Sequence, residues 1–189
     1  MVESTRVYFI QGTIITRNET DSLIKEENTN AHSAPITALN FHPIHQSKSF
    51  DFSKLLLTAS MDWSMKLWNS KDLKAPLLTF DTSSDYVLDL HWNPMLPYVF
   101  ASTDADGYLD IWDLLKDREM PKVHYSVEGK RGICKMRWSP DARKIALGMT
   151  NGALSILQTD KELYQMNPSG DDCSNFDKML QGLQGITTI

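Results

Sequence analysis

The run from Ser102 to Asp113 contains the residue types that could bind a calcium ion. Read as a twelve-position loop, it places carboxylates at positions 3, 5, 9 and 12 and a glycine at position 6. Calcium prefers such clusters of oxygen ligands. Its first position is a serine, however, and its last is the short Asp113, where helix–loop–helix calcium sites carry a bidentate glutamate. The flanking residues alternate in polarity as strands do, so we expect no metal site here.

The other residues capable of chemistry are isolated. His42 and His45 flank Pro43 without a third ligand at a usual metal-site spacing, so we interpret them as a surface pair. Cys134 and Cys173 belong to no paired motif, which favours reduced thiols. The sequence has no G-x-x-x-x-G-K-[ST] phosphate loop and no G-x-S-x-G nucleophile motif. We therefore expect no cofactor and no enzyme, and a catalytic site assembled from distant residues remains the alternative.

Charge and hydropathy exclude two further classes of protein. Acidic residues outnumber basic ones by 24 to 19, giving a formal net charge of −5, which argues against a nucleic-acid-binding protein. No apolar run approaches the roughly 20 residues that a membrane span needs. The first residues lack the pattern of a secretory signal. We expect a cytoplasmic protein.

Three segments of the chain align on one another, which indicates an internal repeat. Each begins with an alternating stretch that ends in an X-Pro pair, at Pro43, Pro94 and Pro140. Trp68 and Trp112 lie 44 residues apart, and Leu157 follows 45 residues later. This period matches a four-stranded propeller blade of about 40–45 residues.

Within each repeat the period is 2, which predicts antiparallel strands rather than helices. In the first strand of each repeat, alternate residues are apolar and should face inward, whereas Asp89 and His91 should face outward. The expected inward positions are Thr37, Leu39 and Phe41, then Leu88, Leu90 and Trp92, then Cys134, Met136 and Trp138. Second and third strands follow around tight turns, of which Asp106-Gly107 and Asn151-Gly152 are strong hairpin signals.

A polar network within the first repeat is also predicted. Asp62 precedes Trp68 by six residues, and the second repeat has an aspartate at the same spacing. A buried chain of histidine, hydroxyl, aspartate and tryptophan can hold a turn against a strand, because each polar group satisfies the next. We assign a structural role to the members of this chain, with Thr58 and Ser60 as alternatives for the hydroxyl: His32, Thr58, Ser60, Asp62 and Trp68, with Asp106 and Trp112 in the second repeat.

The string Thr-Ala-Ser-Met-Asp-Trp-Ser-Met-Lys-Leu-Trp at 58–68 and the pair Trp112-Asp113 resemble the WD40 repeat family. Together with Ser-Asp-Tyr at 84–86, they are most similar to the C-terminal propeller of cytoplasmic dynein intermediate chains. This resemblance extends over about residues 30–180. It implies an all-β fold of WD40-type propeller blades and a non-catalytic subunit of a microtubule-based motor complex in the cytoplasm.

The same resemblance implies particular partners. Such a subunit would bind the dynein heavy chain and other dynein subunits and support cargo attachment. The family's light-chain and dynactin sites lie in a long N-terminal region that is absent from this sequence. A general WD40 interaction adaptor, unrelated to motors, is the alternative.

The expected organisation is an incomplete ring. Residues 1–30 predict part of a preceding blade, and the three repeats span about 31–80, 81–127 and 128–165. About three full blades and one partial blade fall short of most closed propellers, which have about 4–8. The tail 166–189 contains a helical stripe over about 174–183, which either packs on the blades or docks another subunit.

Four residues are candidates for binding a partner. Trp63 stands where the later repeats have glycine, and Asp85-Tyr86 and Arg131 precede the first strands of the second and third repeats. Aromatic residues and arginine are enriched at interaction hot spots. Packing of Trp63 on its own blade, and simple solvation of Lys130-Arg131, are the competing interpretations.

Overall fold

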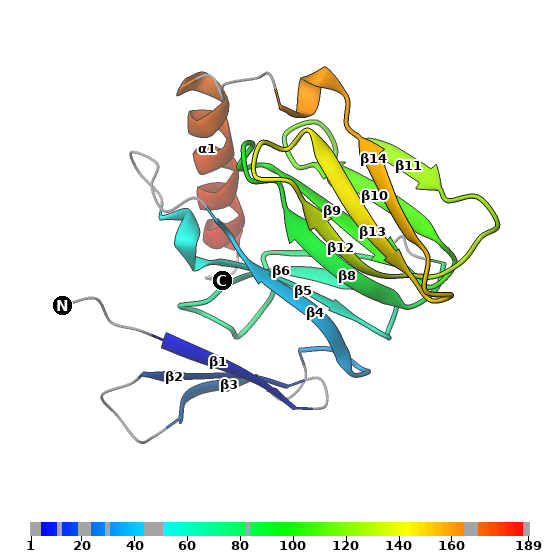
Figure 1. Cartoon of the computed structure of the whole chain (residues 1–189). Helices are drawn as coiled ribbons and strands as arrows, with labels where there is room; N and C mark the ends of the chain where they lie inside the picture. Colours follow the sequence, from blue (N-terminus) through cyan, green and yellow to red (C-terminus); the bar gives the residue numbers. More distant parts are fainter. Residues whose placement is uncertain are drawn as a thin grey trace.

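The computed structural model describes residues 5–10, 13–18, 24–28, 31–43, 51–81, 84–164 and 170–186, with side chains described from residue 31 onward except at 170 and 184–186. These residues form four antiparallel sheets and one α-helix (Figure 1). The prediction of an all-β fold of propeller-type sheets with a C-terminal helix is confirmed, and over the described residues the sheets do not close into a ring.

The sheets follow one another along the chain. The first contains β1 (Thr5–Ile10), β2 (Thr13–Asn18) and β3 (Ile24–Asn28). Blade 1 contains β4 (Ile36–Phe41), β5 (Leu55–Ser60), β6 (Met65–Asn69) and β7 (Leu78–Phe80). Blade 2 contains β8 (Val87–Trp92), β9 (Val99–Asp104), β10 (Tyr108–Asp113) and β11 (Val123–Ser126). Blade 3 contains β12 (Ile133–Trp138), β13 (Lys144–Met149) and β14 (Leu154–Gln158), and so has one described strand fewer than blades 1 and 2.

The blades meet along their first strands, since β8 lies beside both β4 and β12. Side chains of one blade bond to the backbone of the next at this junction. The Asn40 Oδ1 atom accepts the Trp92 N–H at 3.0 Å, and the Asp89 Oδ2 atom accepts the Met136 N–H at 2.9 Å. These bonds satisfy backbone donors on the inner edge of each first strand, which its own sheet leaves unpaired.

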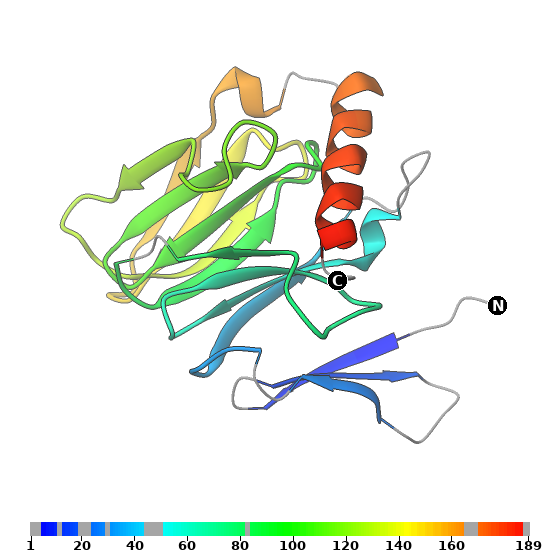
Figure 2. The same ribbon diagram turned by 180° about the vertical axis from the view of Figure 1, so that it is seen from behind.

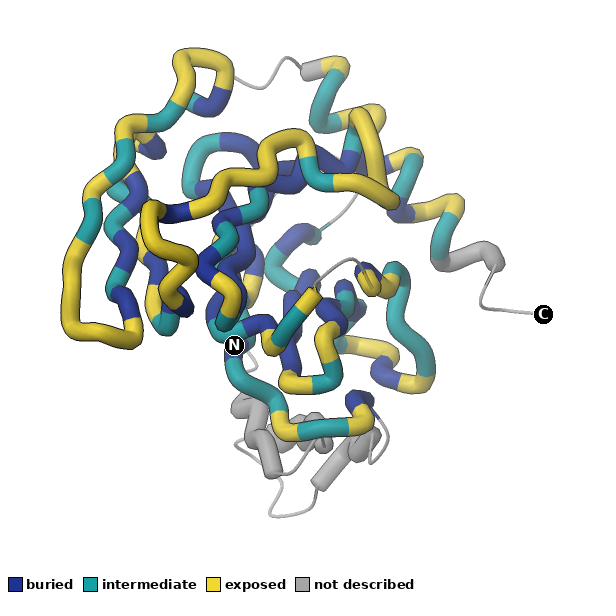
Figure 3. Tube along the Cα trace, turned by 90° about the vertical axis from the view of Figure 1, so that its right-hand side faces the viewer, coloured by how far each residue is buried: buried dark blue, intermediate teal, exposed yellow. Residues whose placement is uncertain are grey.

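An aromatic cluster fills the space between blades 1 and 2. The Phe80 ring from blade 1 packs edge-on against Phe100 and Trp112 of blade 2, at centroid distances of 5.4 and 5.1 Å. All three side chains are buried. Figure 3 shows buried residues concentrated in the interior of the trace and exposed residues along its outside. Packing between successive sheets therefore provides the core.

Helix α1 (Gly170–Ile186) lies across the ends of blades 1 and 2 (Figures 1 and 2). Phe176 and Leu180 are fully buried, and the Phe176 ring lies 5.3 Å from Phe52, in the short 3₁₀ helix η1 (Phe52–Lys54), and 6.4 Å from Tyr98. The helix begins at Gly170, before the expected residue 174, and extends past the expected residue 183. No helix in the described ranges is both long and apolar enough to cross a lipid bilayer.

Three side chains lie elsewhere than the sequence predicts: Phe41 and Asp89, which the alternating pattern misplaces, and His42. Phe41 is 37% exposed, at the end of β4, whereas Asp89 is buried with 3% exposure. Asp89 was expected to face outward, but neighbouring blades cover both faces of β8, so the usual distinction between an inner and an outer face is lost. His42 is not at the surface: it is buried, packs near Phe52 and Trp92, and its Nε2 atom lies 2.8 Å from the Pro97 carbonyl oxygen. His45 lies outside the described residues.

Candidate protein-interaction site

The tight turn after the second strand of each blade is tied to the residue that enters the first strand. Three equivalent backbone bonds make this connection: Met61 N to Pro35 O at 3.1 Å, Ala105 N to Tyr86 O at 3.0 Å, and Thr150 N to Gly132 O at 2.9 Å. The turns and the entry loops therefore lie on one side of the molecule. We call this side the turn face, defined by the turns 61–63, 105–107 and 150–152 and the entry segments 33–35, 84–86 and 130–132.

Each of these turns has one residue in the left-handed region of backbone conformation. In blades 2 and 3 it is a glycine, with φ of 87° at Gly107 and 83° at Gly152, but in blade 1 it is Trp63, with φ of 69°. A bulky residue in this conformation costs about 1–2 kcal/mol relative to one in an ordinary conformation. The Trp63 side chain is 52% exposed, so burial offsets little of this cost. The fold itself therefore gives no reason for a tryptophan here.

The repeat brings the turn that carries Trp63 next to the entry segment of blade 2, which contains Asp85 and Tyr86. In the next junction, a Cβ atom on Gly107 would lie only 2.6 Å from the Arg131 carbonyl oxygen, so the turn of blade 2 touches the entry of blade 3. Trp63 corresponds to Gly107 in the repeat, and Asp85 and Tyr86 correspond to Arg131 and Gly132. A Cβ atom on Gly132 would lie 2.8 Å from the carbonyl oxygen of Ala105, the counterpart of Met61. Tyr86 is 45% exposed and Met61 is 40% exposed. From this correspondence we infer that Met61, Trp63 and Tyr86 form an exposed apolar patch at the junction of blades 1 and 2.

The other two candidates lie on the same face with different surroundings. Asp85 is half-buried, and its Oδ1 atom accepts the Tyr86 N–H at 2.7 Å, which orders the entry loop. Arg131 is exposed one junction further on, beside Lys130, whose Nζ atom lies 5.8 Å from the Tyr108 ring centroid. The face therefore carries an aromatic region followed by a basic one.

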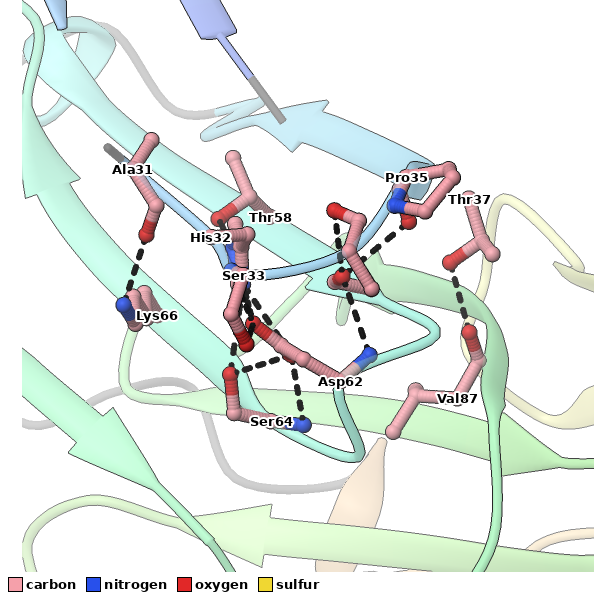
Figure 4. A network of polar contacts seen from close by, with 12 residues as sticks. Ala31, His32, Ser33, Pro35, Thr37, Thr58, Asp62, Ser64, Lys66 and Val87 are labelled. Atoms are coloured by element: carbon pink, nitrogen blue, oxygen red, sulfur yellow. Dashed lines mark hydrogen bonds and ion pairs between the residues drawn. The ribbon is translucent and has the colours of Figure 1, made fainter. Parts of the chain in front are cut away.

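A polar network supports the turn that carries Trp63 (Figure 4). The His32 ring connects two side chains: its Nδ1 atom lies 3.0 Å from Asp62 Oδ2, and its Nε2 atom lies 2.7 Å from Thr58 Oγ1. The Trp68 indole N–H donates to the same Thr58 oxygen at 2.9 Å. Asp62 also accepts the Ser33 N–H at 2.9 Å, and the Ser64 N–H and hydroxyl at 3.0 and 2.7 Å.

Burial and hydrogen bonding set the charges in this network. Burial lowers the pKa of His32, and the attraction of Asp62 offsets this only in part, so the imidazole is neutral near pH 7. For Asp62, burial opposes ionisation, but hydrogen bonds from Ser64 and Ser33 outweigh it, and the pKa is lowered to about 2. An ionised carboxylate beside a neutral, Nδ1-protonated His32 satisfies all these contacts.

Two proposed members of the network have other contacts. Ser60 does not link His32 to Trp68; its hydroxyl lies 3.0 Å from the carbonyl oxygens of Ala34 and Pro35. In blade 2, Trp112 donates to Ser102 Oγ at 3.2 Å, whereas Asp106 is exposed and accepts a 3.3 Å bond from the Ser84 hydroxyl. The structure therefore does not bring Asp106 and Trp112 together, because blade 2 has no histidine to bridge them.

The calcium-like run Ser102–Asp113 spans the hairpin of β9 and β10. Its carboxylates have separate partners, since Asp104 accepts the Tyr108 N–H at 2.8 Å and Asp110 lies 2.6 Å from His124 Nδ1. Within the ranges that the structure describes, no group of three or more histidine, cysteine, aspartate or glutamate side chains could hold a metal ion.

Sequence reasoning missed three polar residues. Ser64 completes the shell around Asp62, and the spacing Asp-x-Ser at 62–64 is a local signal for such a turn. Asn40 and Asp89, which join the blades, have no local signal, because their partners are 52 and 47 residues away in the chain.

Comparison with known proteins agrees with the repeat. Residues 24–69 and 74–113 match the family described as WD domain, G-beta repeat. The chain is 37% identical over 153 residues to the cytoplasmic dynein 1 intermediate chain of Drosophila melanogaster. The matched region covers 81% of this chain and 22% of that relative, so the chain spans about a fifth of the relative's length.

Proposed function

We propose that this chain is a non-catalytic subunit of a cytoplasmic dynein complex. The premise is that it carries WD40 repeats and that most of this chain is similar to part of a dynein intermediate chain. In this proposal the turn face binds the motor heavy chain, the subunit supports cargo attachment in microtubule-based transport, and the ATP chemistry belongs to the heavy chain.

The exposed, left-handed Trp63 is the observation that supports this binding face. Residues held in costly backbone conformations concentrate at functional sites. Tryptophan and tyrosine are also the residues most enriched at binding hot spots, where truncation typically costs about 2 kcal/mol or more. Trp63 combines both features, and Tyr86 adds a second exposed aromatic side chain. Arg131 lies one junction further on, and a rim charge contributes little affinity.

The chemistry-bearing side chains support the non-catalytic part of the proposal. Asp62 and His32 bond to each other and to the turn backbone, and Asp110 bonds to His124 on the adjacent strand. These contacts stabilise turns and strand pairs. The carboxylates and histidines are thus explained by the architecture of the blades.

Trp63→Gly separates binding from folding, because glycine suits the left-handed turn better than tryptophan does. We expect the free energy of unfolding of the variant to exceed that of the wild type by about 1 kcal/mol. The variant should capture dynein heavy chain about 30-fold more weakly. Tyr86→Ala should behave similarly in capture, and Arg131→Ala should change it little. Capture is measured with purified heavy chain on immobilised protein.

Two outcomes would contradict the proposal. Wild-type binding by Trp63→Gly and Tyr86→Ala would place the heavy chain elsewhere on the surface. If the wild type captured no heavy chain at all, the alternative of a general WD40 adaptor outside any motor would be favoured.

A further inference from the structure

The outer edge of β14 has backbone groups directed away from its sheet. At one end of β14 the Ala153 carbonyl accepts the Met149 N–H, and at the other the Thr159 N–H donates to the Arg143 carbonyl, each at 2.9 Å. Because alternate residues of an antiparallel strand bond to opposite sides, the residues between them that face outward are Leu154, Ile156 and Gln158. Within the described chain no strand pairs with this edge.

The equivalent edge is paired in both other blades. In blade 1, Leu67 corresponds to Ile156, and its carbonyl accepts the Leu77 N–H at 2.7 Å, just before β7. In blade 2, Ile111 corresponds to Ile156 and lies opposite Val123 of β11. After β14 the chain turns instead into the short 3₁₀ helix η2 (Lys161–Leu163). Blade 3 therefore retains the pairing surface without the strand that occupies it elsewhere.

The side chains at this edge are apolar and exposed. Leu154 is 71% exposed and Ile156 is 64% exposed, whereas their counterparts Leu109 and Ile111 in blade 2 are buried. None of the five residues of β14 is charged or a proline. Edge strands that avoid pairing usually carry such a charge or proline. In blade 2, Pro121 and Lys122 stand directly before the edge strand β11.

The two existing outer strands show which sequence fits. Opposite the position of Leu154 each has an aromatic residue, Phe80 or Tyr125, and opposite the position of Ile156 each has an aliphatic one, Leu78 or Val123. The residue between them is polar: Thr79 in one strand and His124 in the other.

We propose that β14 is an acceptor for strand addition by another protein. The occupant is an extended segment with the pattern aliphatic–polar–aromatic, which pairs antiparallel to β14 as the fourth strand of blade 3. Main-chain hydrogen bonds supply affinity, and the two apolar side chains next to Leu154 and Ile156 supply specificity. This proposal is independent of the turn face.

The test uses a fluorescent peptide with the sequence of residues 121–127, Pro-Lys-Val-His-Tyr-Ser-Val, titrated with the 189-residue protein and followed by anisotropy. A matched peptide carries N-methyl groups at the positions of Val123 and Tyr125, whose counterparts would pair with Ile156 and Leu154. This modification removes two backbone donors and leaves every side chain unchanged. We expect this peptide to bind at least about tenfold more weakly, since a tenfold change corresponds to about 1.4 kcal/mol and a net hydrogen bond contributes about that much.

Variants of β14 provide the reciprocal test. Ile156→Pro removes an outward N–H, which an edge strand tolerates, and should weaken peptide binding at least tenfold with an unchanged circular dichroism spectrum. Ile156→Thr keeps the N–H and should weaken binding less. In the wild type, bound peptide should slow hydrogen exchange of the Ile156 amide.

Three results would overturn the proposal. Equal binding of the N-methylated and unmodified peptides by the wild-type protein would exclude strand pairing, whether or not Ile156→Pro folds. Unchanged exchange at Ile156 would place the peptide elsewhere. A wild-type dimer in light scattering that Ile156→Pro converts to monomer would identify a second copy of the chain as the occupant instead.

Discussion

Removing the Asp62 carboxylate should destabilise blade 1 more than any other single aspartate change on the turn face. In Asp62→Ala, the contacts to His32, to the Ser33 N–H and hydroxyl, and to the Ser64 N–H and hydroxyl are lost. Ser33 is exposed, so water replaces its lost partner. Ser64 is only 5% exposed, so its N–H and its hydroxyl lose their acceptor in a buried place. The His32 Nδ1 atom still lies 3.2 Å from the Ser64 Oγ atom.

The size of the effect follows from these two buried donors of Ser64. A buried donor without a partner costs about 1–3 kcal/mol. Two such donors, with water reaching the vacated site in part, give a loss of about 3 kcal/mol in the free energy of unfolding. For a chain of this length, a change of 1 kcal/mol shifts the melting temperature by about 2–4 °C, so Tm should fall by about 6–12 °C.

Asp106→Ala is the matched control, since it removes the same carboxylate from the equivalent turn of blade 2. Asp106 is exposed and accepts a 3.3 Å bond from the exposed Ser84 hydroxyl, so the Tm of this variant should change by less than about 2 °C. Both variants are melted in the calorimeter at pH 7. Equal shifts for the two variants would refute the reasoning, because burial of the network would then contribute nothing.

The remaining predictions concern pH, the junction between blades and calcium. Because the pKa of His32 is lowered by folding, its contribution to stability is complete above about pH 6.5 and is lost as the pH falls below that value. Because the pKa of Asp62 is lowered to about 2, its contribution is complete above about pH 4 and is lost toward pH 2. Urea midpoints should therefore decrease from pH 7 to pH 5; a midpoint that rises would contradict the assignment. Asp89→Ala should lower the free energy of unfolding by about 2–4 kcal/mol, because it leaves the buried N–H of Met136 without its acceptor. An unchanged free energy of unfolding in urea denaturation would show that the junction does not depend on this carboxylate. Millimolar calcium should leave Tm unchanged, because the carboxylates of Ser102–Asp113 already have separate partners in a hairpin; a saturable rise in Tm would show a metal site.

Local patterns in the sequence determined the repeat and much of the strand order. Alternation of apolar residues, together with glycine at residues 107 and 152, predicts hairpins because both features act over a few neighbouring residues. Trp63 could be singled out in the same way, since the repeat shows that its position requires a left-handed backbone. The set His32, Thr58, Asp62 and Trp68 could be proposed from spacing alone.

Only the tertiary structure decided which residues those groups contact. Thr58 rather than Ser60 links His32 to Trp68, because strand pairing within blade 1 directs the two hydroxyls to different neighbours. Asp89 is buried because β8 is covered on both faces by other blades, which no local pattern encodes. Among the described residues, the outer edge of β14 is likewise unpaired because the chain turns into the helix η2 where blades 1 and 2 add a strand. Local periodicity sets which residues can lie on a strand, whereas burial and pairing depend on segments 26 to 52 residues apart meeting in space.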